Sequence, residues 1–163
     1  MDIDFEREVS QNAVLGSAAL WAATNQYCED IDTDRGVPIA HLFLVIPLVF
    51  HRQSAETIYK LQMTAGSFYR AMTDEKTITV GLQRRLQNHS RNTFEALNLA
   101  FASKLLILDQ EELEVIPGRK SLPFTYPKHA TDAKNIVAAG KRVGNWLAVT
   151  EFPVLCKLLR IRF

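Results

Sequence analysis

The core of this protein depends on the run Val37-Pro38-Ile39-Ala40-His41-Leu42-Phe43-Leu44-Val45-Ile46-Pro47-Leu48-Val49-Phe50, in which His41 is the one clearly polar residue. Arg35 precedes the run and His51-Arg52 follows it, so it is shorter than the roughly 20 apolar residues that a membrane-spanning helix needs. Each fully buried Leu, Ile, Val or Phe side chain stabilises a fold by roughly 1.5–3 kcal/mol. The run is therefore predicted to be a buried element that dominates the core.

One helix is expected before this run, and another is expected in its first part. From Val9 to about Glu29, apolar residues recur near helical spacing and alanines favour one closely packed face. The polar segment 30–36 then predicts a surface loop. Within the run, Pro38 suits the first turn of a helix and Pro47 would end or kink it, which predicts a helix over about 38–46.

A capping-box type start at Ser54, with Thr57 three residues later, predicts a short helix after the run. Further helices are indicated by the apolar spacings Phe68/Met72, then Ile78/Leu82/Leu86, then Phe94/Leu97/Phe101/Leu105. The apolar segments 105–108 and 113–116, joined by turn-like polar residues, predict a β-hairpin. Three helices followed by a hairpin is the order of a winged helix-turn-helix, so the segment of about 67–117 is interpreted as winged-helix-like.

A Pro-rich loop over 117–127 should lead to a last long helix over about 130–149, in which Gly140 and Gly144 permit the close approach of a neighbour. The predicted fold class is mainly α with a small β-hairpin, a winged-helix-like helical domain of the α+β type. With 163 residues, 47% hydrophobic and 23% charged, the chain suits one domain over 1–163.

The charge balance of the chain restricts its partners. Nineteen Lys and Arg against eighteen Asp and Glu leave a net charge of +1, so binding to nucleic acid or to an anionic membrane would have to be local. The acidic start of the chain lacks the order of a secretory signal, so a cytoplasmic protein without a membrane segment is expected. Cys28 and Cys156 have no metal-type spacing and are expected to be reduced, with no disulfide.

Catalytic and cofactor motifs are not found. The chain has no GxSxG, GxxxxGK[ST], GxGxxG or HExxH pattern, so no catalytic residue is assigned, no cofactor is predicted and an enzyme is not expected. The histidines 41, 51, 89 and 129 have no carboxylate or cysteine at metal-ligand spacing, so no metal site is assigned. His41 is expected to be a hydrogen-bonded core residue, and His51 a polar cap to the apolar run rather than a phosphate contact.

One basic cluster could touch DNA. It consists of Arg84, Arg85, His89 and Arg91, and phosphate neutralisation by such residues supplies much of the affinity of DNA-binding proteins. The neighbouring hairpin is acidic at Asp109, Glu111, Glu112 and Glu114, and phosphates would be repelled there. Sequence-specific DNA reading, non-specific DNA contact within a larger complex, and a solvated or partner-facing surface all remain open, with salt bridges between hairpin and helices as a further alternative.

Two other groups of residues could bind a protein. Trp21 and Trp146 could anchor an interface, since Trp is enriched at binding hot spots, but packing in the core is the favoured interpretation for each. The last four residues, Arg160, Ile161, Arg162 and Phe163, alternate basic and apolar side chains. They could add a short strand or dock a partner through Ile161 and Phe163, or they could be an ordinary edge element of the fold.

Three segments together resemble one family, the middle component of ABC three-component systems, which includes the small subunit of Lamassu-type anti-phage systems. They are Gln11-Asn12-Ala13-Val14-Leu15-Gly16-Ser17-Ala18-Ala19-Leu20-Trp21, the run from Pro38 through His51-Arg52, and Lys141-Arg142-Val143-Gly144-Asn145-Trp146-Leu147. The resemblance spans most of the chain, although Ala13 and Asn145 replace the Pro and Arg that the family usually has there. It implies a non-enzymatic adaptor that joins an SMC- or Rad50-like ABC-type ATPase to an effector, often a nuclease, encoded in the same operon. The alternative hypothesis is a winged-helix DNA-binding transcriptional regulator.

Overall fold

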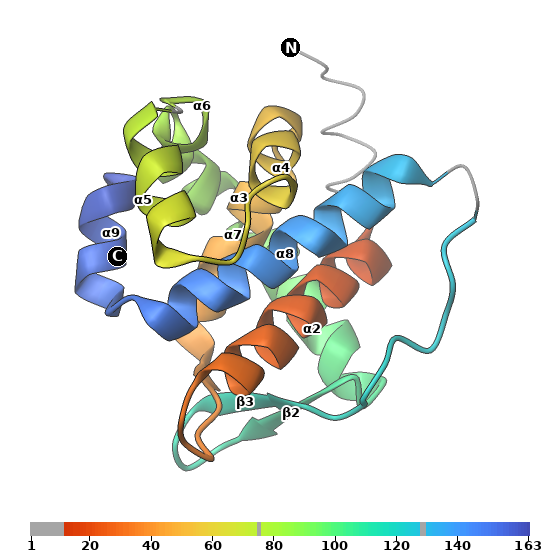
Figure 1. Cartoon of the computed structure of the whole chain (residues 1–163). Coiled ribbons are helices and arrows are strands. Elements are labelled where there is room, and N and C mark those ends of the chain that lie inside the picture. Colours follow the sequence, from red (N-terminus) through yellow and green to blue (C-terminus); the bar gives the residue numbers. More distant parts are fainter. Residues whose placement is uncertain (1–11, 75, 128–129) are drawn as a thin grey trace.

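The computed structural model describes residues 12–74, 76–127 and 130–163, so the part of the first predicted helix before residue 12 lies outside the described residues (Figure 1). The elements follow the chain in the order α2 (Ala13–Asp30), β1 (Val37–Pro38), the 3₁₀ helix η1 (Ile39–Leu44), α3 (Val45–Val49), α4 (Arg52–Tyr59), α5 (Ala65–Asp74), α6 (Lys76–Thr79), α7 (Leu82–Ala102), β2 (Leu106–Asp109), β3 (Glu114–Pro117), α8 (Thr131–Val149) and α9 (Phe152–Leu159).

Helices α2 and α8 lie side by side in the middle of the molecule and run in the same direction (Figure 1). Their contact consists of small residues. Gly140 lies against the backbone of Ala19, and Gly144 against the backbone of Ala23 one turn further along both helices. The predicted close approach at Gly140 and Gly144 is therefore confirmed, because an added Cβ at either position would meet the backbone of α2.

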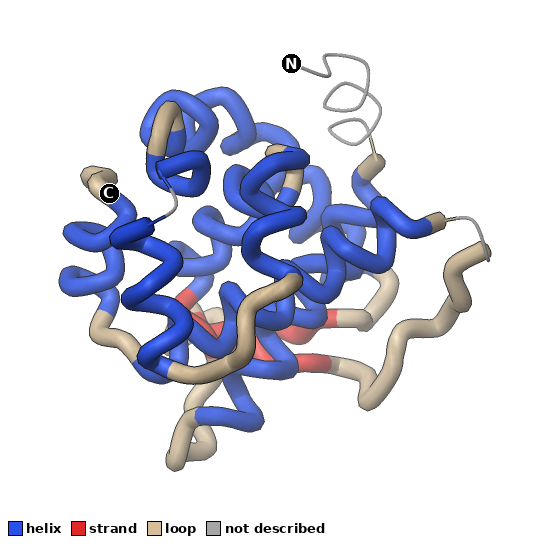
Figure 2. Tube along the Cα trace, turned by 45° about the horizontal axis from the view of Figure 1, so that its top comes forward, coloured by secondary structure: helices blue, strands red, loops and turns tan. Residues whose placement is uncertain are grey.

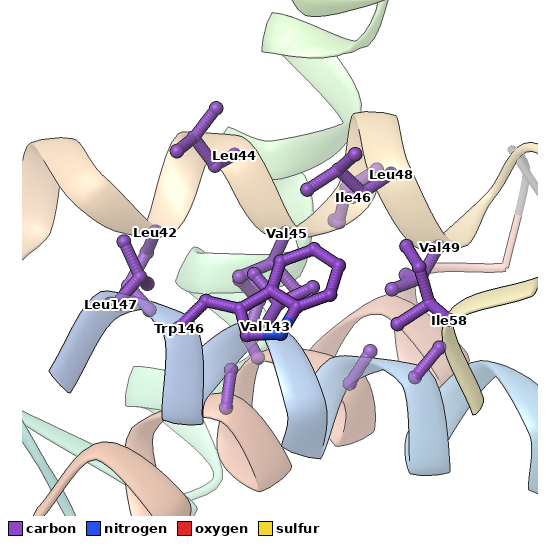
Figure 3. Packing of buried hydrophobic residues seen from close by; sticks show 14 of the residues in the cluster. Leu42, Leu44, Val45, Ile46, Leu48, Val49, Ile58, Val143, Trp146 and Leu147 are labelled. Carbon is purple, nitrogen blue, oxygen red and sulfur yellow. The ribbon is translucent and has the colours of Figure 1, made fainter. Parts of the chain in front are cut away.

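Most of the apolar run is buried, as predicted, but Ala40 is exposed and the run is not one helix. Residues 44–50 are all buried, and in Figure 3 the side chains of Val143 and Trp146 extend from α8 toward this run. The run forms β1, η1 and α3 in succession, so the predicted helix over 38–46 is wrong in its bounds. Pro47 does not end a helix, because it lies in the first turn of α3, where the missing N–H of proline is not needed.

The predicted start of the next helix at Ser54 is also wrong. Helix α4 begins at Arg52, and its N-terminal cap is His51, whose ring nitrogen Nδ1 accepts a hydrogen bond from the Ser54 backbone N–H at 3.3 Å. The Ser54 hydroxyl lies 2.7 Å from the same nitrogen. His51, rather than Ser54, is therefore the residue that caps the first turn of this helix.

The boundary predicted between a helix around Leu82 and Leu86 and another around Phe94 and Leu97 does not exist. All four residues belong to the single helix α7, because no Gly or Pro interrupts 82–102. Phe94 is 58% exposed, so it does not contribute to the buried face of α7.

The predicted hairpin is confirmed as β2 and β3, and it is part of a three-stranded antiparallel sheet of order β1-β3-β2. The strands lie close together (red in Figure 2), and Figure 1 shows β2 and β3 at the lower edge of the view. Val37 of β1 pairs with Val115 of β3, so the sheet joins segments far apart in the sequence. The fold is therefore mainly α with a small antiparallel sheet, as predicted. The third strand, β1, comes from outside the segment 67–117. The winged-helix interpretation of that segment stays a prediction.

No helix among residues 12–74, 76–127 and 130–163 is long and apolar enough to cross a membrane. The two cysteines of the chain, Cys28 and Cys156, are free and half-buried, and burial raises the pKa of both thiols.

Candidate partner-binding surface

The end of the chain lies against the first turns of α7. The Gln83 side chain holds the backbone of Arg162 at both polar groups: its Oε1 accepts from the Arg162 N–H at 2.7 Å, and its Nε2 donates to the Arg162 carbonyl at 3.1 Å. An amide side chain that pairs with both groups of one residue fixes the local path of the backbone. The structure therefore brings together α7 and the tail, which the sequence assigned to separate roles.

Aromatic side chains continue from the tail across the neighbouring elements. The Phe163 ring meets Phe152 edge-to-face at 5.2 Å, and Phe152 is stacked on His41 at 3.7 Å between ring centroids. Phe43 of η1 meets Phe94 of α7 edge-to-face at 4.9 Å. Such pairs are worth about 0.5–1.5 kcal/mol beyond the area they bury, so they hold these rings in defined positions.

A shallow hollow connects these two groups of rings. Its volume is about 200 Å³, and it is lined by Phe43, Gln83, Leu86, Gln87, Arg162 and Phe163. Phe94 and Phe163 remain 58% and 59% exposed. We call the surface formed by Phe43, Gln83, Leu86, Gln87, Phe94, Phe152, Arg162 and Phe163 the aromatic surface.

Exposed cations occur on the same elements as the aromatic surface. Arg84 and Arg91 of α7 are exposed, as are Arg160 and Arg162 of the tail. The Arg91 guanidinium forms an ion pair with Glu95 one turn along the helix at 2.9 Å, and its side chain is 88% exposed. An exposed pair of this kind contributes little to stability, so Arg91 remains available to a partner.

Arg85 does not fit the predicted DNA-contact group. Its guanidinium donates to the backbone carbonyls of Pro47 at 3.1 Å, Val80 at 2.9 Å and Ile78 at 2.9 Å, and to the Ser54 hydroxyl at 3.3 Å. These bonds connect the first turn of α7 to α3, α4 and α6. We therefore correct the assignment of Arg85 from a DNA contact to a structural residue, since its guanidinium donors are used by three carbonyls and one hydroxyl within the protein.

His89 also points into the structure rather than outward. Its ring is half-buried, its Nδ1 lies 3.0 Å from the side-chain nitrogen of Asn92, and it meets the Phe50 ring edge-to-face. Burial, followed by the charge of Arg85, lowers the pKa of His89, so the ring is neutral at pH 7. His89 therefore has no positive charge near neutral pH with which to attract a phosphate. Of the predicted DNA-contact cluster, only Arg84 and Arg91 are exposed.

The remaining described histidines are structural. His41 is half-buried and stacked on Phe152 rather than enclosed in the core, and burial lowers its pKa. His51 caps α4, and burial, with smaller effects from Arg85 and His89, lowers its pKa to about 4. His129 lies outside the described residues. Among residues 12–74, 76–127 and 130–163 no group of three or more His, Cys, Asp or Glu side chains could hold a metal ion.

The pKa of His51 predicts an acid-sensitive fold. Because the folded-state pKa lies near 4 and the usual value is 6.5, the unfolded chain binds a proton first as the pH falls through this window. The free energy of unfolding should fall by about 1–2 kcal/mol between pH 7 and 4.5, a value reduced for the half-exposed ring. His41 and His89 act in the same direction. Urea unfolding at the two pH values measures the difference.

The matched variant for this prediction is His51→Asn. Asparagine is a good N-cap but does not titrate, so the variant should keep α4 and lose part of the pH dependence. An equal loss of stability on acidification in the variant and in the unsubstituted protein would contradict the assignment to His51.

Two residues of the predicted partner interface are buried. Trp146 is 1% exposed and lies against Phe68 at 4.7 Å, and Ile161 is 6% exposed. Both belong to the core, so their assignment to a partner interface is corrected. Trp21 is half-buried, and its indole N–H donates to the Arg119 carbonyl at 2.9 Å, which fixes the segment after the hairpin against α2. Arg160, Arg162 and Phe163 are exposed and remain candidates.

The acidic hairpin has a cationic partner within the protein. The Arg35 guanidinium lies 2.7 Å from Glu114 and 3.3 Å from Glu112, and Glu114 also accepts from the Gly36 N–H. These bonds tie the loop after α2 to the hairpin. The predicted salt bridges to the acidic hairpin therefore exist, but the cation comes from a loop rather than from a basic helix.

Sequence reasoning missed several residues of the aromatic surface, namely Phe43, Gln83, Phe94 and Phe152. Phe43 belongs to the run that is predicted to be buried, and Phe94 to an apolar spacing that predicts a helix. One sequence signal could have found Phe94: it lies one residue after Thr93 and two before Ala96, and these small residues define a buried face that excludes position 94.

The fold and its surfaces define a class, a small, mainly helical domain with an exposed aromatic surface. The chain belongs to the family described as ABC-three component (ABC-3C) system Middle Component 3, whose model matches residues 1–163. No curated protein and no solved structure matches the chain. The resemblance to the middle component of ABC three-component systems is thereby confirmed, and the Lamassu-type assignment stays a prediction.

Proposed function

We propose that this protein is a non-enzymatic adaptor subunit that joins an SMC- or Rad50-like ABC-type ATPase to an effector, a nuclease, in a Lamassu-like anti-phage complex of the cytoplasm. Membership in the ABC-3C middle component family supports a role among other components. The observation that carries the adaptor role is the aromatic surface, where Phe94 and Phe163 stay more than half exposed although each contacts another ring.

Rings held in this way are suited to protein binding. Phe43 and Phe94 position each other, so their side chains would lose little conformational entropy when a partner covers them. Apolar side chains surrounded by Arg and Gln are typical of interface centres, where aromatic residues and Arg are enriched and Lys and Glu are depleted. Arg84, Arg91 and Arg162 would then contact acidic groups at the rim of the partner.

The regulator hypothesis has less support. Of the four residues proposed to contact DNA, Arg85 is engaged by internal carbonyls and His89 is neutral and half-buried. The two exposed arginines could neutralise about two phosphates, which is too few for tight binding at physiological salt. The isolated protein is therefore expected to bind duplex DNA weakly and without sequence preference, and nanomolar selective binding would favour the regulator.

The adaptor proposal predicts that Phe94→Glu and Phe163→Glu disrupt assembly. Loss of a central aromatic contact at an interface typically costs 2 kcal/mol or more, so capture of the ATPase or effector by the tagged protein should fall at least about 30-fold for the double variant. Co-expression of the three components encoded together, followed by affinity capture and titration of the purified proteins, measures this effect.

A matched control is Tyr69→Glu, which changes an aromatic residue of α5 that is 47% exposed and lies outside the aromatic surface. It should leave capture unchanged. Circular dichroism should show that all variants keep the helical content. Undiminished capture by the folded double variant would contradict a role for the aromatic surface.

The absence of catalysis is part of the same proposal. The purified protein alone should hydrolyse neither ATP nor DNA, because its sequence has no phosphate-binding loop and no nucleophile motif. Metal-dependent cleavage that one substitution in this chain abolishes would refute this part.

A further inference from the structure

The outer strand of the small sheet has an unused hydrogen-bonding edge. In the order β1-β3-β2, strand β2 pairs on one side only. The Gly118 N–H donates to the Leu105 carbonyl at 2.9 Å, and Ile107 is opposite Ile116. Since backbone groups alternate in direction along a strand, residues 105, 107 and 109 face β3, and the N–H and C=O groups of Leu106 and Leu108 face away from it.

The other edge of β3 supports this assignment. The Ile39 N–H donates to the Leu113 carbonyl at 2.9 Å, so alternate residues from 113 onward face β1 and the intervening residues face β2. Pro117, opposite Leu106, has no N–H. At this position no N–H is needed for a hydrogen bond between β2 and β3. The backbone groups of Leu106 and Leu108 have no hydrogen-bond partner among the residues that the structure describes.

There is room for another strand beside this edge. A groove of about 520 Å³ follows it, lined by Phe101, Lys104, Leu106, Ile107, Leu108, Gln110 and Gly118. On the solvent-facing side of the hairpin, Ile107 and its pair Ile116 are 48% and 40% exposed. An open edge with exposed isoleucines is a template for strand addition.

We propose that the occupant of this edge is β2 of a second copy of the chain, in an antiparallel pair centred on Ile107. In this register Leu106 of each copy is opposite Leu108 of the other, and both residues direct their free backbone groups at the partner. The strand is thus complementary to itself. The two Ile107 residues meet at the twofold axis, next to the two Ile116 residues, and form an apolar stripe across the joined hairpins.

Charge complementarity favours the same arrangement. Lys104 precedes β2, and the acidic turn 109–112 follows it. Antiparallel pairing of two copies brings Lys104 of one copy to the acidic turn of the other at both ends, whereas a parallel pair would place like charges together. The net charge of +1 adds little repulsion between copies.

The pairing is weak in isolation. Two four-residue strands bury less than the roughly 1,200–2,000 Å² of a stable interface, so dimers should form at concentrations of about 100 µM and above. Analytical ultracentrifugation from about 5 to 500 µM should show a rising average mass that approaches twice that of the monomer. Ile107→Lys, which places two charges at the twofold axis, should remain monomeric throughout. A monomer of the unsubstituted protein at the highest concentration would overturn the proposal.

Cysteine cross-linking tests the register. Residues opposite each other in a non-hydrogen-bonded pair have Cα atoms about 4.5 Å apart, within the range of a disulfide. Ile107→Cys should therefore form a covalent dimer under mild oxidation. In the control Ile116→Cys, the cysteine lies one strand further from the twofold axis. The two cysteines of a dimer would then be too far apart to form a disulfide. The unsubstituted protein, with Cys28 and Cys156, sets the background.

Equal cross-linking of Ile107→Cys and Ile116→Cys would overturn the proposed register. These experiments use the protein alone, so their outcome is independent of the aromatic surface and of the proposed adaptor function. Loss of capture by the Phe94 and Phe163 variants with an intact dimer, or the reverse, separates the two proposals.

Discussion

Gly144→Ala should lower the free energy of unfolding by about 3 kcal/mol or more, although it adds one methyl group. The new Cβ would overlap the carbonyl oxygen of Ala23, a backbone atom that cannot rotate away as a side chain could. Helices α2 and α8 would have to separate along their whole contact, and overpacking of a rigid interface usually costs 1–3 kcal/mol, sometimes more. Urea unfolding followed by circular dichroism measures the change.

Two other glycines provide a graded comparison. At Gly140 the added Cβ would lie 2.8 Å from the Ala19 carbonyl oxygen, so Gly140→Ala should be destabilising but less so than the change at Gly144. At Gly66, in the first turn of α5, an added Cβ meets nothing within 4 Å. Gly66→Ala should be neutral or slightly stabilising, because alanine favours a helix. Similar stability of all three variants would show that the contact between α2 and α8 is not as close as described.

Leu44→Asp should give an insoluble protein or cost more than about 4 kcal/mol. Leu44 is fully buried at the end of η1 and belongs to the main apolar cluster. An aspartate there would either bury a charge without a partner or be protonated at a large cost, and it would also remove the packing of the leucine. Since small domains are stable by only about 5–15 kcal/mol, most of the stability would be lost.

The control for this substitution is Ala40→Asp, one turn earlier in η1, where the side chain is exposed. It introduces the same charge into the same helix without burying it. Soluble expression and unfolding by urea should be near normal for Ala40→Asp and absent for Leu44→Asp. A soluble, cooperatively folded Leu44→Asp variant would mean that the run is not the core of this protein.

The candidate site was only partly predictable from sequence. The alternation of basic and apolar residues predicts that the tail could dock a partner, and Arg162 and Phe163 are exposed. The same pattern did not distinguish Ile161, which is buried. Likewise, Trp21 and Trp146 looked alike, but one is half-buried and the other lies in the core beside Phe68.

The cluster of positive residues shows why function was harder to predict than fold. Arg84, Arg85 and Arg91 all read as exposed cations on one helix. Arg85 instead donates to carbonyls of α3 and α6, which the chain brings close only after it folds. Charge alone cannot tell whether a guanidinium will face solvent or internal carbonyls, since both satisfy its donors.

By itself, the sequence determined what depends on neighbouring residues: the burial of most of the run 37–50, the hairpin around the acidic turn, the helical character of most of the chain, and the need for glycine at 140 and 144. Each follows from local periodicity, turn chemistry or side-chain size. Only the tertiary structure decided the pairing of Val37 with Val115, the contact of Gln83 with Arg162, and the meeting of Phe43 with Phe94. These contacts join residues far apart in the chain, and which of many such pairings forms is set by the packing of the whole core.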